Sequence, residues 1–326
     1  MPVNSTYAAA PFDHAKADII LRSSDKVDFR IFKLFLSLAS PFFETLFDIP
    51  QPAQASAEQI KDGLVVIPVT EDSKTLDVLL RFCYPCTLAD DPHLGTFEHI
   101  IPVLEAAKKY ALDAIERKVC RTLSNPKILE VEPFRCFAIA RRGQLRGETL
   151  LAARYTLTQP LLPSWFKEID MITATDLLAL LTYHQECGDA VYALGSDMSW
   201  IESHYRDSQG CGWLSRRSSS GVTRSSGGYV CPKYCECSKS PTPRYQLFAS
   251  DSKSLQWWED FMEETFVALR DKPCAATVES FVEKTVQRVT RLGCSTCSGL
   301  VPEGMRGFSR LLVKKVDEVV SRVSRD

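Results

Sequence analysis

The cysteines of this chain are the side chains best suited to chemistry, and most of them lie in its second half. Eight of the twelve cysteines come after residue 180. Cys294 and Cys297 have the Cys-x-x-Cys spacing of zinc-binding motifs, and a polar stretch upstream adds the thiols of Cys231, Cys235 and Cys237. A structural zinc ion takes four Cys or His ligands in a tetrahedron. The spacing therefore predicts a structural zinc site that uses Cys294 and Cys297.

Two ligand sets would complete this site. In the first, His184 and Cys187, which are three residues apart on one face of a predicted helix, join the 294/297 pair. In the second, two of the three upstream thiols join that pair instead. A metal that connects distant segments would stabilise a region interrupted by a long polar loop. The alternative interpretation is that the cysteines stay reduced and that some are buried as small apolar side chains.

Catalytic residue patterns are missing from the sequence. None of the five histidines belongs to a His pair at helical spacing with an adjacent Glu, which zinc hydrolases require. We find no Gly-x-Ser-x-Gly elbow, phosphate-binding glycine loop or dinucleotide fingerprint. Because His184 and Cys187 lie on one helix, ligation or packing is favoured over a catalytic Cys/His pair. The sequence predicts a binding protein and no enzyme.

Composition excludes further classes of function. The net charge is −2, and the basic pairs Arg141-Arg142 and Lys314-Lys315 are isolated, so we expect no nucleic-acid partner. No run of about 18 apolar residues indicates a membrane span. The first residues lack the basic and apolar regions of a secretory signal. We expect an intracellular protein of the cytoplasm or nucleus.

The elements that would position these residues follow from hydrophobic periodicity. An alternating pattern and turn residues predict a hairpin over 17–31, and residues 64–69 read as a buried strand. Ser40-Pro41 is a typical N-cap and first helical residue. Residues 50–63 read as a loop. Helical spacing then covers 74–83 and 96–123, with Asn125-Pro126 as a break.

The rest of the chain reads as helical. Two helices are expected over 127–158, and a Thr173/Asp176 capping box opens another that we expect to stop at Gly188. We predict an α+β fold in which an N-terminal domain with a small sheet precedes an all-α region. The expected boundaries are a flexible tail at 1–16, the first domain at 17–124, a helical region at 125–205, a flexible Ser/Gly/Arg-rich loop at 206–246, and a helical region at 247–326 that completes the second domain.

Specific residues of the first domain match a known family. They are Asp18, Phe29, Lys33, Leu36, Ser40-Pro41, Phe42-Phe43, Leu46-Phe47, Phe82-x-Tyr84 and Ala106-Ala107-Lys108-Lys109-Tyr110-Ala111-Leu112. In order and spacing they resemble the BTB/POZ domain. Phe32 replaces the usual His, and Pro85-Cys86 replaces the usual Thr-Gly. The resemblance implies a domain that binds other protein chains.

A second, looser resemblance covers the remainder. Fungal BTB proteins with a cysteine-containing helical C-terminal region are similar at Tyr183-His184-x-x-Cys187, Trp257-Trp258, Lys272-Pro273-Cys274 and Cys294-x-x-Cys297. This likeness implies no particular reaction for the region.

The family resemblance implies self-association as a homodimer or with another BTB domain. The apolar residues expected at the dimer interface are Phe12, Phe32, Leu34, Phe35 and Leu38. We expect a protein-interaction adaptor whose C-terminal helices bind a second protein. The alternatives are a substrate receptor of a cullin-type ubiquitin ligase and a nuclear transcription cofactor. Cullin binding is disfavoured because Ile49-Pro50-Gln51 replaces an apolar-x-Glu motif, and no DNA-binding module is visible.

Overall fold

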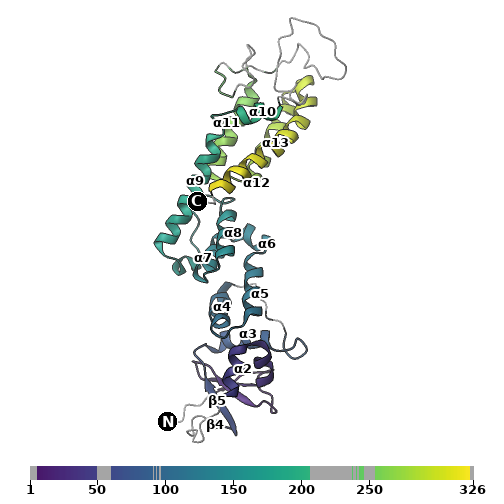
Figure 1. Ribbon diagram of the computed structural model, residues 1–326. Coiled ribbons are helices and arrows are strands. Elements are labelled where there is room, and N and C mark those ends of the chain that lie inside the picture. The colour runs from purple at the N-terminus through teal and green to yellow at the C-terminus, as the bar shows by residue number, and fades with distance from the viewer. Residues whose placement is uncertain are drawn as a thin grey trace. The chain divides into compact units, whose positions relative to one another are not determined.

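The chain folds as two compact units. The computed structural model describes residues 6–49, 60–90, 92, 94, 97–205, 237, 240, 242–245 and 254–323 (Figure 1). The N-terminal unit comprises Met1–Ala152 with Phe166–Ile172, and the C-terminal unit comprises Ala153–Trp165 with Thr173–Asp326. The α+β prediction is confirmed, since a small sheet with helices is followed by a helical region.

The described residues of the N-terminal unit form a five-stranded sheet in the order β1-β3-β2-β5-β4. The strands are β1 (Thr6–Tyr7), β2 (Ile19–Arg22), β3 (Val27–Ile31), β4 (Ile60–Lys61) and β5 (Leu64–Pro68). The predicted hairpin is the antiparallel β2–β3 pair, and β5 runs parallel to β2. Of the five residues of β5, only Val66 is buried, so this strand is less enclosed than expected.

Two short strands depart from the expected loops. The expected flexible tail at 1–16 is wrong for residues 6–16, because β1 pairs in parallel with β3 and Phe12 is fully buried. The expected loop at 50–63 contains β4, which pairs with β5. Residues 1–5 and 50–59 lie outside the described residues. A strand of two residues is too short to show an alternating pattern in the sequence. It becomes recognisable only by its hydrogen bonds to a partner strand.

Helices cover this sheet. They are α1 (Lys33–Ala39), α2 (Pro41–Asp48), α3 (Ser73–Cys83), α4 (Ile100–Lys109) and α5 (Asp113–Leu123), with a short 3₁₀ turn, η2 (Phe97–His99), ahead of α4. The cap at Ser40 is confirmed, because its Oγ accepts hydrogen bonds from the backbone N–H groups of Phe42 and Phe43. Asp18 Oδ1 accepts from Lys33 N at 2.8 Å, which secures the start of α1.

Further helices belong to the same unit. These are α6 (Pro126–Val131), α7 (Pro133–Arg142), most of α8 (Arg146–Thr156) and the 3₁₀ turn η3 (Lys167–Met171). Two helices were predicted over this stretch, but Pro133 starts a third, since it cannot continue the hydrogen bonding of α6. The compact N-terminal unit thus extends beyond the predicted end of the first domain at residue 124, as far as Ala152.

The C-terminal unit is built from long helices. They are α9 (Ala174–Ala193), α10 (Ser199–Tyr205), α11 (Gln256–Asp271), α12 (Ala275–Arg291) and α13 (Ser295–Val323). The Thr173/Asp176 capping box that opens α9 is confirmed. The buried core includes Trp257 and Trp258, each 3 % exposed. No helix among the described residues is long and apolar enough to cross a membrane.

Gly188 does not end its helix, and the predicted stop there is wrong. It lies inside α9, where a Cβ atom would come within 2.1 Å of the carbonyl oxygen of Arg270 in α11. Glycine is required at this position because the backbones of the two helices approach closely, and not because the helix ends there.

Candidate functional site

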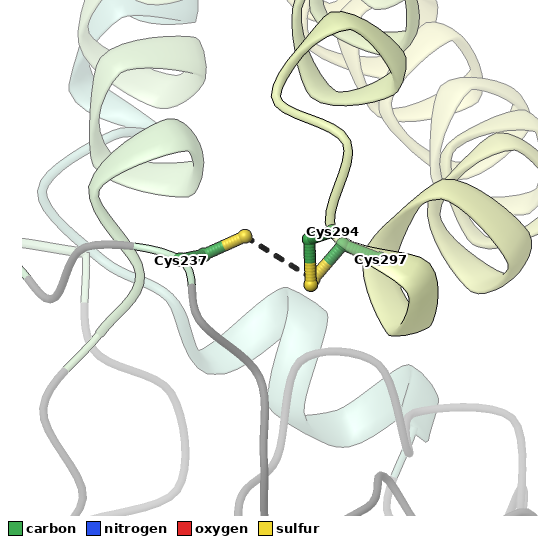
Figure 2. Close-up of side chains that lie close together, drawn as sticks. All are labelled: Cys237, Cys294 and Cys297. Atoms are coloured by element: carbon green, nitrogen blue, oxygen red, sulfur yellow. Dashed lines mark hydrogen bonds between the residues drawn. The ribbon is translucent and has the colours of Figure 1, made fainter.

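Three cysteine side chains converge in the C-terminal unit. The Sγ atoms of Cys237, Cys294 and Cys297 all lie within 4.8 Å of one another, and we call this group the thiol cluster (Figure 2). The Cys237 and Cys297 sulfurs are 3.5 Å apart. Cys294 and Cys297 are buried, and Cys237 is half-buried. The cluster is therefore largely shielded from solvent.

Two of these thiols are positioned by the start of α13. Gly293 turns the chain after α12 with a φ of +68°, a left-handed conformation that suits glycine. Ser298 N and Ser298 Oγ both donate to the carbonyl oxygen of Cys294, at 2.9 and 2.8 Å. This places Cys297 on the first turn of the helix, so helical geometry holds both sulfurs on one side.

The third thiol comes from a distant part of the sequence. Cys237 precedes the segment 242–245, whose backbone is held by Glu259 in the first turn of α11. The Glu259 carboxylate accepts from Arg244 N at 2.8 Å and from Tyr245 N at 3.1 Å, and Trp258 Nε1 donates to the Tyr245 carbonyl at 3.0 Å. Glu259 could not be singled out from the sequence, since nothing in its local pattern distinguishes it from a solvent-exposed helical Glu.

The sulfur positions are compatible with a metal. With Zn–S bonds of about 2.3 Å, the sulfurs of a tetrahedral site lie about 3.8 Å apart. The Cys237 and Cys297 sulfurs are 3.5 Å apart and the other pairs lie within 4.8 Å, so the separations are close to that value. The three thiols could therefore supply three of the four ligands of a tetrahedral metal ion with small movements of their side chains.

The first predicted ligand set is wrong, because His184 and Cys187 do not join the cluster. His184 is 2 % exposed, and its Nε2 lies 2.9 Å from the carbonyl oxygen of Asp271. Burial lowers the pKa of His184, which favours the neutral ring that donates to this carbonyl. Cys187 is fully buried in the core, and burial raises its pKa to about 11. Both residues therefore serve packing.

Of the second set, Cys237 is placed beside the 294/297 pair, whereas Cys231 and Cys235 lie outside the described residues. The same holds for most of the predicted flexible loop 206–246. Elsewhere, cysteines behave as small apolar side chains. Burial raises the pKa of Cys83 and of Cys136 to about 12.

The predicted dimer residues divide into three groups. Leu34 and Leu38 project from one face of α1 and are 62 % and 78 % exposed. Phe32 and Phe35 are half-buried and contact each other, with ring centroids 5.5 Å apart. Phe12 has no exposed surface, and its ring packs on Phe29 at 5.6 Å. The prediction of Phe12 at the interface is therefore wrong, because this residue belongs to the core.

Two further exposed apolar residues lie at the two ends of α2, the helix that packs against α1. Phe42, at the start of α2, is 40 % exposed, whereas its neighbour Phe43 in the same motif is buried, and the sequence did not distinguish the two. Ile49, the first residue of the altered cullin motif, is 54 % exposed. Pro50 and Gln51 are outside the described residues.

The comparison with known families concerns the N-terminal unit. Residues 11–127 match the family model described as BTB/POZ domain. No curated protein matches the chain. The similarity to fungal BTB proteins with a cysteine-containing C-terminal region therefore stays a prediction.

Proposed function

We propose, from the premise that residues 11–127 are a BTB/POZ domain and hence a protein-interaction domain, that this chain is an adaptor. It self-associates through the N-terminal unit and presents the helices of the C-terminal unit to a second protein. Its role is to bring two proteins together without a reaction of its own.

The exposed face of α1 is the observation that carries this proposal. Leu34 and Leu38 are one helical turn apart, so both side chains point the same way. Burying a leucine side chain contributes about 1.5–3 kcal/mol, which a single chain forgoes at these two positions. These two leucines, with the half-buried and mutually packed rings of Phe32 and Phe35 at adjacent positions of the chain, are the apolar strip that a second copy would cover.

Self-association in a two-fold dimer uses the same patch on both protomers. The strip on α1 suits this arrangement, because leucine against leucine is self-complementary. Phe42 on the neighbouring helix α2 extends the apolar surface.

Light scattering on the purified full chain tests the proposal. We expect the wild type to have twice the monomer mass at micromolar concentration and the Leu34→Glu/Leu38→Glu variant to be monomeric, since two carboxylates would be buried without partners. Leu178→Glu/Leu162→Glu is the matched control, because these leucines are 64 % and 75 % exposed in the C-terminal unit. A monomeric wild type, or a dimeric α1 variant, would refute self-association through α1.

We also propose that the thiol cluster holds a structural zinc ion. Thiolates favour zinc and other soft or borderline metals over magnesium and calcium. Elemental analysis of protein purified without chelators should find one zinc per chain, and Cys294→Ser should abolish it. Cys274→Ser is the control, since Cys274 is a half-buried thiol of the same unit outside the cluster. Zinc-free wild type from zinc-supplemented cells would refute this part of the proposal.

A further inference from the structure

The thiol cluster joins two segments that are far apart in the sequence. Cys237 and Cys297 are separated by 60 residues, yet their sulfurs are 3.5 Å apart (Figure 2). We infer that a thiophilic metal at this cluster is a cross-link that fixes the Cys237-bearing segment to the start of α13, an inference that rests on the zinc proposal above. The cross-link determines whether segment 242–245 stays bound to α11.

One side of the cross-link is rigid without a metal. Cys294 and Cys297 lie on either side of the N-terminal end of α13, and the two hydrogen bonds from Ser298 fix the carbonyl of Cys294. The core residues Val301 and Met305 follow on the same helix and are fully buried. These two sulfurs therefore form a preorganised half-site, which lowers the entropic cost of binding a metal.

The other side is held by polar contacts and by the buried ring of Tyr245, which stacks on Phe266. Segment 242–245 is held by the Glu259 carboxylate and by Trp258 Nε1, and Ser240 N donates to the carbonyl of Ser254 at 2.8 Å. Glu259 is only 6 % exposed while the segment is in place, so its desolvated carboxylate relies on the backbone N–H groups of the segment as hydrogen-bond donors. A metal bond to Cys237 keeps the segment close to this carboxylate.

A metal explains the cluster better than a disulfide. A disulfide joins two sulfurs at about 2.05 Å and would leave the third thiol unused. Closing a loop of 60 residues removes entropy from the unfolded chain, so a bond across this distance stabilises the folded state. No carboxylate or imidazole joins the group among the described residues, and the donor set is sulfur alone. Sulfur donors favour zinc and other thiophilic metals, and cadmium and cobalt are chemical substitutes for zinc.

Hydrogen exchange on the full-length chain tests the cross-link. In zinc-loaded wild type, the amides of Ser240, Arg244 and Tyr245 should exchange slowly. After removal of zinc by a chelator they should exchange about tenfold faster or more, because local opening is no longer opposed by the metal bond. Cadmium should restore the protection and magnesium should not. Peptides of the N-terminal unit should be unchanged throughout.

Single variants give a second readout. Cys237→Ser should retain a weakened zinc site on Cys294 and Cys297 but show the fast exchange of the stripped protein at 240–245. Cys274→Ser should match the wild type in both measurements. The wild-type comparison with and without chelator keeps the test valid if a variant fails to fold.

The outcomes separate the two proposals. If zinc never binds, the zinc proposal fails and the cross-link fails with it. If zinc binds but its removal leaves the exchange of Ser240, Arg244 and Tyr245 unchanged, the cross-link is refuted while the zinc proposal stands. If the exchange rises on removal and falls again with cadmium, the cross-link is supported.

Discussion

At the scale of single residues, buried carboxylates hold backbone segments and an edge strand in place. Asp28 is fully buried on β3, and its two oxygens pair with Arg22 Nε and Lys61 Nζ, each at 2.6 Å. Glu259 caps segment 242–245 in the C-terminal unit in the same manner. A buried carboxylate is stable only when its lone pairs are satisfied, so each one specifies the position of its partners.

Glu168 is a buried carboxylate whose contribution to stability should depend on pH. It is 2 % exposed, and the hydrogen bonds from Arg135 hold its pKa below the ordinary value of 4.5, although burial acts in the opposite direction. Because the folded-state pKa is the lower one, the stabilisation is complete above pH 4.5 and is lost as the pH falls through the folded-state pKa. Glu168→Gln should therefore destabilise the N-terminal unit by about 2 kcal/mol at neutral pH.

Urea unfolding at a series of pH values measures this effect. The difference between wild type and Glu168→Gln should shrink below pH 4.5, because the wild-type carboxyl group then becomes protonated. A difference that stays constant into acid would contradict the role of the ionised form.

Gly188 supplies a second prediction at this scale. Gly188→Ala should destabilise the C-terminal unit by about 1–3 kcal/mol, because the new Cβ collides with the carbonyl of Arg270. Gly307→Ala in α13 is the control, since its Cβ would meet nothing within 4 Å, and it should be neutral or stabilising by up to about 1 kcal/mol. Thermal unfolding of the two variants measures this difference. If both substitutions changed the stability equally, helix propensity alone would explain the two results.

At the scale of elements, the junction of α1 and α2 orients the proposed interface. Ser40 ends α1 and caps α2, and its Oγ also donates to the carbonyl oxygen of Tyr110 at the end of α4, at 2.5 Å. The buried hydroxyl thus connects α2 to the end of α4, and the backbone N–H of the same residue donates to the Leu36 carbonyl of α1. The direction of the exposed face of α1 depends on this connection.

Replacing that hydroxyl should weaken the N-terminal unit. We expect Ser40→Ala to cost about 1–2 kcal/mol in urea unfolding, since two amides of α2 lose their cap. Ser37→Ala, a half-buried position within α1, should change stability by less than about 0.5 kcal/mol. If the two variants behaved alike, the cap would have no energetic role.

At the scale of the whole molecule, each unit has its own core. One cluster of buried residues contains Phe12, Phe29 and Leu76, and the other contains Trp258, Phe261 and Phe308. The proposed interface lies in the first unit and the thiol cluster in the second. The two proposed activities, self-association and metal binding, should therefore be separable.

Combined measurements of mass and metal content check this separation. Leu34→Glu/Leu38→Glu should change the mass of the particle but keep its zinc, and Cys294→Ser should lose zinc but keep the mass. Dissociation of the dimer by Cys294→Ser would place self-association in the C-terminal unit instead.

Local patterns in the sequence were enough for much of the fold. The β2–β3 hairpin, the Ser40 cap, the Thr173 capping box and the BTB/POZ resemblance all depend on residues close together in the chain, and each is confirmed. The Cys-x-x-Cys spacing of Cys294 and Cys297 is a local pattern of the same kind.

Contacts between distant residues decided the rest. Phe12 was expected at a surface and lies in the core, Gly188 was expected to stop a helix and instead allows two helices to touch, and His184 bonds to a carbonyl of α11 rather than joining the thiols. Cys237 could be chosen from the three upstream thiols only after folding brought it to α13. The physical reason is that periodicity and capping are short-range properties, whereas burial and close approach depend on which segments pack together.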